Sequence, residues 1–118
     1  MGAFLDAARE RAERKREVAT WQTSVLDEIR QQVTADAALL QSFGVTANSK
    51  DGKPIVTLAR RSNARGGKIQ LSMTADQSRV VMASDQGGVN KAFGPGTATD
   101  AIVKEFCATA ARIFEMDN

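Results

Sequence analysis

Histidine and tyrosine are absent from this chain of 118 residues, and Cys107 is its single cysteine. The lack of histidine removes the commonest general acid–base group and the commonest metal ligand. One cysteine cannot form an intrachain disulfide, and no histidine is present to activate its thiol, so we expect Cys107 to be a small core residue. No glycine-rich loop ends in Lys-Ser or Lys-Thr. These absences predict a protein that is not an enzyme and that holds neither a metal ion nor a cofactor.

Long hydrophobic runs are also missing. No apolar stretch approaches the roughly 18 residues of a membrane-spanning helix. Charged residues begin at Asp6, so the N-terminus shows no apolar segment of a secretory signal. We therefore expect a cytoplasmic protein that does not engage a membrane.

Aromatic side chains are absent from residues 44–92, although six occur elsewhere in the chain. Sheets that bind single-stranded nucleic acid stack the bases on aromatic side chains of the strands. This part of the chain cannot do so. Any contact with nucleic acid would be made to phosphates and would be weak and non-specific.

What the sequence does contain is a series of short segments separated by turn signals. Asp51-Gly52, Gly66-Gly67 and Gly87-Gly88 mark turns, and the segments between them are rich in strand-forming residues. Residues 68–74 alternate apolar and polar side chains, which is typical of a strand with one buried face. The pattern predicts an antiparallel meander of four or five strands, with candidates at 45–49, 54–61, 68–74, 79–84 and 89–93.

Helical patterns flank this meander. Residues 4–32 lack glycine and proline, and an apolar stripe at helical spacing runs from Val18 to Val33. One helix to residue 43 and two helices with a bend near Thr34 both fit the pattern, with Gly44 as the stop. A C-terminal amphipathic helix of about 18 residues follows, with Thr97 or Thr99 as its cap. This order predicts an α+β fold with both helices on one face of the sheet. The predicted core residues are Trp21, Leu71, Phe106 and Ile113.

Positive charge is concentrated on the meander. Residues 50–91 carry eight basic and three acidic side chains, whereas residues 18–49 and 92–118 each have an acidic excess. Clustered cations bind phosphate or acidic partners, but cations on edge strands also keep sheets from pairing with other chains. The residues predicted to bind a partner or phosphate are Arg60, Arg61, Arg65, Lys68 and Arg79.

The first 17 residues are predicted to form a charged helical arm, and residues 18–118 a single domain. The arm carries five basic and four acidic side chains, and pairs such as Glu10 and Arg14 have the spacing that supports a solvated helix. A helix over residues 4–32 would be about 43 Å long, against the roughly 20 Å that the strands span. We therefore expect the arm to project and to dock on a second molecule. Its predicted contact residues are Phe4, Leu5, Arg9, Arg11 and Arg14.

Together these features favour a small non-enzymatic protein-interaction module: an adaptor, an inhibitor or immunity-type protein, or a small chaperone. It would use the N-terminal helix and the basic surface of the sheet. Its partner would be another protein, most simply a second copy of itself in a homodimer. The alternative is a nucleic-acid-associated accessory protein that contacts phosphates through the basic meander.

Overall fold

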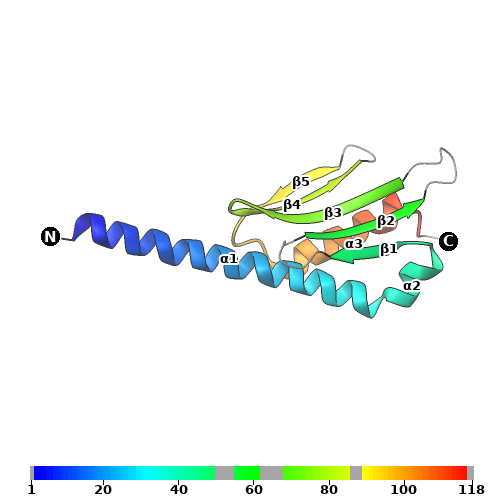
Figure 1. Cartoon of the computed structure of the whole chain (residues 1–118), viewed down its shortest axis with the longest axis horizontal. Helices are drawn as coiled ribbons and strands as arrows, with labels where there is room; N and C mark the ends of the chain where they lie inside the picture. The colour runs from blue at the N-terminus through cyan, green and yellow to red at the C-terminus, as the bar shows by residue number, and fades with distance from the viewer. Residues whose placement is uncertain (1, 50–54, 62–67, 86–88, 117–118) are drawn as a thin grey trace.

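The computed structural model describes residues 2–49, 55–61, 68–85 and 89–116. Two helices, α1 (Ala3–Ala35) and α2 (Ala37–Ser42), precede the strands, and α3 (Thr99–Ile113) follows them (Figure 1). The strands are β1 (Thr46–Ser49), β2 (Ile55–Arg61), β3 (Lys68–Asp76), β4 (Arg79–Ser84) and β5 (Asn90–Phe93). This confirms the α+β class. The three glycine turns and Arg65 lie outside the described residues.

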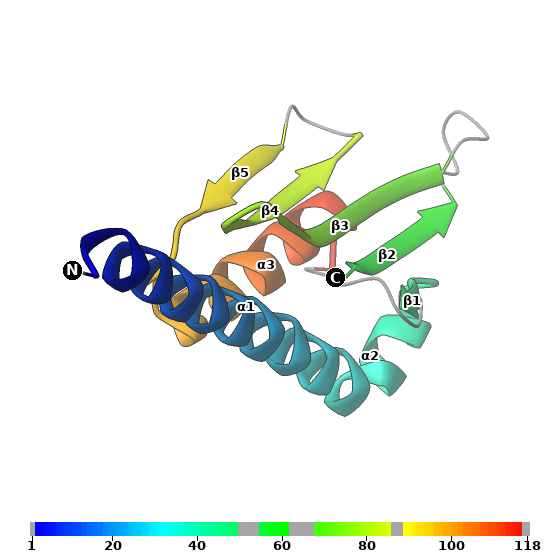
Figure 2. The same ribbon diagram turned by 60° about the vertical axis from the view of Figure 1, so that its left-hand side comes forward.

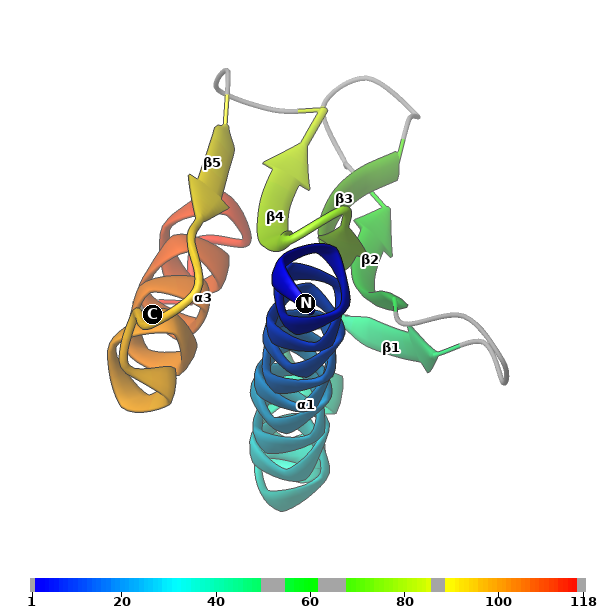
Figure 3. The same cartoon turned by 90° about the vertical axis from the view of Figure 1, so that its left-hand side faces the viewer.

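The five strands form one meander in the order β1-β2-β3-β4-β5, and every neighbouring pair is antiparallel. Met73 in the central strand lies opposite Val56 on one side and Met82 on the other. These three side chains, with Leu58, Leu71 and Val80, are buried on one face. α1 and α3 lie side by side beneath that face (Figure 3), as the alternation in residues 68–74 predicted.

The core joins this sheet face to both helices. α1 contributes Val25, Leu26 and Ile29, and the C-terminal segment contributes Ile102, Phe106, Ala110 and Phe114. The predictions for Leu71 and Phe106 are confirmed, since both are at most 2% exposed. Trp21 and Ile113 are only partly buried and pack against the margin of the core. The indole N–H of Trp21 donates a hydrogen bond of 3.0 Å to the carbonyl of Thr97. This bond ties α1 to the segment that leads into α3.

The break between α1 and α2 lies at Asp36, two residues after the predicted bend. The hydroxyl of Thr34 donates to the carbonyl of Arg30 within α1. The side-chain amide of Gln32 donates to the Asp36 carboxylate at 2.6 Å, and the Asp36 backbone N–H donates to the Gln32 carbonyl. On the other side of the break, the backbone N–H of Leu40 in α2 donates to the Asp36 carbonyl at 2.9 Å. The two-helix alternative is therefore correct.

Gly44 ends α2 as predicted. Its φ of 74° lies in the left-handed region that favours glycine. Its N–H donates to the carbonyl of Gln41, and the N–H of Val45 donates to the carbonyl of Leu40. This pair of bonds is the Schellman arrangement, which satisfies two of the free carbonyls at a helix end.

The prediction that Thr97 or Thr99 caps α3 is wrong. The cap position is Ala98, whose side chain makes no capping hydrogen bond, and Thr99 is the first helical residue. The hydroxyl of Thr97 instead donates to the carbonyl of Gly94 at 2.8 Å. The Thr97 hydroxyl therefore stabilises the turn before α3 instead of capping the helix.

α1 extends far beyond the sheet, as Figures 1 and 2 show. Its 33 residues correspond to about 50 Å at 1.5 Å per residue. The molecule measures 65 Å along its longest axis and 27 and 25 Å along the others. Its radius of gyration is 16.9 Å, whereas a compact chain of this length would have roughly 13 Å. The overhang is the N-terminal end of α1, where residues 3–11 are all exposed.

Candidate functional site

A groove of about 700 Å³ lies where the arm leaves the domain, and we call it the root groove. α1 supplies one wall and the turn between β3 and β4 supplies the other. Four cationic side chains and no carboxylate line it. The lining residues are Arg11, Arg14, Lys15, Arg16, Val18, Ala19, Gln22, Gln77 and Ser78. The root groove is therefore a basic concave surface.

Gln22 holds the two walls together. Its side-chain amide donates to the carbonyl of Gln77 at 2.8 Å and to the carbonyl of Arg79 at 2.9 Å. Gln77 has a φ of 54°, so the turn is tight. Arg79 forms an exposed ion pair of 3.4 Å with Asp76 across the same turn. The β3–β4 turn is therefore fixed against α1. Arg79 follows Ser78, a lining residue of the root groove, in the sequence.

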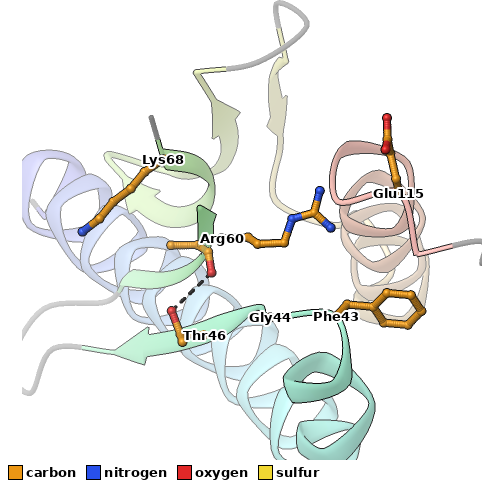
Figure 4. A pocket seen from close by; sticks show the side chains of 7 residues that line it. Phe43, Gly44, Thr46, Arg60, Lys68 and Glu115 are labelled. Atoms are coloured by element: carbon orange, nitrogen blue, oxygen red, sulfur yellow. Dashed lines mark hydrogen bonds between the residues drawn. The ribbon is translucent and has the colours of Figure 1, made fainter. Parts of the chain in front are cut away.

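The other cations predicted to bind phosphate lie at the far end of the sheet. Arg60 and Lys68 line a second groove of about 740 Å³ with Phe43, Gly44, Thr46, Ala59 and Glu115 (Figure 4). Arg61 ends β2, where its backbone pairs with Lys68. Nine residues of β3 separate this end from the Arg79 end by about 26 Å at roughly 3.3 Å per residue. The structure thus does not bring Arg79 together with Arg60 and Lys68.

Arg60 makes a structural contact that was not predicted from the sequence. Its guanidinium donates to the carbonyl of Phe114 at the end of α3 and lies 5.9 Å from the centre of the Phe114 ring. Cations near a helix C-terminus satisfy free carbonyls and interact favourably with the helix dipole. Figure 4 shows Arg60 reaching toward α3 while Lys68 extends away from it. Arg60 therefore ties α3 to the sheet, and the two cations do not converge.

The arm carries its charges on separate sides of the helix. Asp6, Glu10, Glu13 and Glu17 recur at spacings of three and four residues, which places them along one side. None of these carboxylates lines the root groove, whereas Arg11 and Arg14 do. Among the described residues, the ion pairs involve no arm residue, so the expected pair of Glu10 and Arg14 is not formed.

The tip of the arm exposes its largest apolar side chains. Phe4 is 94% exposed and Leu5 is 56% exposed, and the predicted contact residue Arg9 is also exposed. A fully exposed phenylalanine at the end of a projecting helix buries nothing within its own chain. The arm therefore presents apolar and charged groups whose partners are not among the described residues.

Cys107 lines a third groove of about 230 Å³, which is mostly apolar and lies between α1, α2, α3 and β2. The prediction that it is a core residue is wrong, because the residue is exposed. Ile102, Phe106 and Ala110 turn inward at four-residue spacing, and Cys107 follows Phe106 by one residue and so points away. Partial burial, and then the nearby negative charge of Asp36, raise the pKa of the Cys107 thiol. The thiol is thus less readily deprotonated, and therefore less nucleophilic, than an unperturbed cysteine thiol.

Cys107 should therefore react more slowly with Ellman's reagent in the folded chain than in the urea-unfolded chain at the same mildly alkaline pH. Folding raises the thiol pKa, so the folded chain has the smaller thiolate fraction, and the difference should shrink as the pH rises through the folded pKa. Asp36→Asn should increase the folded rate because it removes the nearby negative charge, whereas the remote Asp6→Asn should not. Equal rates for the folded and unfolded chains would contradict this.

Within the described ranges, no three potential ligands among histidine, cysteine, aspartate and glutamate gather as a metal site. No helix of the described chain is both long enough and apolar enough to cross a membrane. Comparison with known protein families, curated proteins and solved structures found no match.

Proposed function

We propose that this chain is a non-enzymatic protein-interaction module that binds its partner through the arm and the root groove. The observation that carries the proposal is the 94% exposure of Phe4 at the tip of a helix that extends beyond the domain. A helix without tertiary contacts is marginal in water, and most helical stability in proteins comes from packing. A partner that covers the arm would supply that packing.

The arm offers what such a contact needs. Exposed aromatic side chains at the centre of a contact contribute much of its free energy, while charges at the rim set orientation and specificity. Phe4 is such an anchor, and the carboxylates and cations of the arm lie along different sides of the same helix. An adaptor, an inhibitor or immunity-type protein, and a small chaperone all act by this kind of contact, without chemistry.

A second candidate is a nucleic-acid-associated protein that contacts phosphates through its basic residues. The observation that favours it is the group of four cations in the root groove, with Arg79 beside them. The centre of the open sheet face offers little to phosphate, because Thr57, Ala59, Ser72 and Thr74 are uncharged. Loss of heparin retention in Lys15→Glu/Arg16→Glu, with the fold intact, would favour this candidate over the first.

A photo-cross-linking phenylalanine derivative in place of Phe4 tests the proposed function. We expect irradiation of cells that contain this variant to give a discrete adduct of this chain with another protein, because the arm tip lies at the contact. The same derivative at Leu39, which is 52% exposed on the domain, is the matched control and should give much less adduct. An arm tip that yields no adduct, or no more than Leu39, would contradict the proposal.

A further inference from the structure

We infer that the third groove is a binding site for a small molecule that has an apolar body and a single positive charge, such as an arylalkyl ammonium ion. The groove lies at the opposite end of α1 from the arm, where α1 meets α2, α3 and β2. Its described lining residues are mostly apolar and include one carboxylate, that of Asp36, and no cation. The site is therefore separate from the proposed protein contact.

The floor of this groove is part of the core, whereas its rim exposes apolar surface. The floor residues are at most 8% exposed, and they are Leu40, Leu58, Phe106 and Ala110. Leu39 also lines the groove, and it is 52% exposed. A ligand that covers Leu39 removes apolar surface from water, which is favourable. Because the floor is already packed, the ligand does not have to order it, and this lowers the cost of binding.

The size of the groove limits the ligand to a small one. The groove has a volume of about 230 Å³, and an apolar cavity of about 150 Å³ is known to hold benzene. There is therefore room for one aromatic ring with a short alkyl chain. Met116 lines the groove, and its backbone N–H donates to the carbonyl of Ala111 at 2.9 Å. An unbranched methionine side chain adapts to the shape of what it contacts.

Asp36 determines the charge that the ligand should carry. Its carboxylate accepts a hydrogen bond of 2.6 Å from the side-chain amide of Gln32, which orients it without neutralising it. Among the ion pairs of the described residues, none includes Asp36. Partial burial, and then the charge of Asp36, raise the pKa of the Cys107 thiol, which lines the groove from α3. The negative charge is thus felt inside the groove, where an ammonium group is attracted and a carboxylate group is repelled.

The other two grooves do not have this character. Four cationic side chains line the root groove, and Arg60 and Lys68 line the groove at the far end of the sheet. Cations of this kind repel a positively charged ligand. We therefore expect an apolar cation to bind at the third groove in preference to the others.

Titration of the isotope-labelled full chain with phenylbutylamine, followed by the backbone amide chemical shifts, tests this inference. We expect the shifts to cluster at Leu39, Cys107 and Met116, with a Kd on the order of 1 mM for a ligand of this size. Phenylbutanol has the same body without the charge, so it should bind about threefold more weakly. Phenylbutyrate carries the opposite charge and should bind more weakly than the alcohol.

Two pairs of variants separate the contributions of charge and shape. Asp36→Asn should bind the amine and the alcohol equally, whereas the remote Asp6→Asn should keep the preference for the amine. Ala111→Phe places a ring in the groove from the exposed side of α3 and should abolish binding. Ala108→Phe adds the same ring to an exposed position of α3 outside the described lining, and it should bind the amine like the unchanged chain. The dispersion of each spectrum shows whether the variant is folded.

The inference is overturned if the amine shifts no residue of the groove, if the three compounds bind equally, or if Ala111→Phe binds as tightly as Ala108→Phe. Shifts at the groove when the ligand-free chain is diluted would show that a second copy occupies it. Abundant adducts of the photo-cross-linker at Leu39 with another protein would show that a protein occupies it. Either result would also overturn the assignment to a small molecule.

Discussion

Truncating Phe106 to alanine is expected to destabilise the domain by about 3–5 kcal/mol, the range for removing a buried aromatic side chain. Phe106 is 2% exposed, and it belongs to the buried cluster that includes Leu58 of β2 and Ile29 of α1. The cavity cannot close easily, because α3 is held at its start by Trp21 and at its end by Arg60. Chemical denaturation monitored by tryptophan fluorescence measures the change.

Leu39→Ala provides the control for this truncation. Leu39 is 52% exposed on the short helix α2, so losing its side chain should cost less than about 1 kcal/mol. Both variants should be compared at the same protein concentration. If Phe106→Ala lowers the free energy of unfolding by less than about 1 kcal/mol, Phe106 does not lie at the centre of the core.

Removing residues 2–16 should abolish self-association while leaving the domain folded. No side chain in this segment is buried; the first buried side chain of α1 is Val25. The deletion removes Phe4 and every charged residue of the arm except Glu17. Light scattering should report a monomer, and circular dichroism should retain the sheet signal with the loss of helix that corresponds to the missing residues.

The substitution Phe4→Asp is a milder version of the same test. It keeps the length of the arm and replaces the exposed aromatic side chain at the tip with a small charged one, so the apolar anchor is lost. We expect it to weaken the dimer without changing the unfolding of the domain. Unfolding of the deletion variant would show that residues 2–16 are part of the core rather than an arm.

Much of the fold followed from local patterns. Ile69, Leu71 and Met73 share a face because the strand period is two, and this alternation correctly predicted which face the helices cover. The absence of glycine and proline from residues 3–43 predicted a long N-terminal helix, but it did not predict that α1 ends at Ala35. The predicted burial of Cys107 was wrong because the apolar face of α3 is narrow. A residue one position from Phe106 is rotated by about 100° around the helix.

The site was less predictable because it depends on contacts distant in sequence. Gln22 and Gln77, which hold the root groove together, are 55 residues apart. Nothing near Arg14 in the sequence shows that the β3–β4 turn lies beside it. The role of Arg60 had one local signal: it shares its strand face with Val56 and Leu58, so a cation there must reach past the apolar layer to a polar group. That group is the end of α3.

The most direct measurement is the molar mass of the full-length chain by light scattering over a range of concentrations and salt. Docking of the arm on a second copy predicts a mass that approaches about twice the 12.7 kDa of the chain at high concentration and low salt, and that falls toward the monomer as salt is added. A mass of 12.7 kDa under all conditions would contradict it.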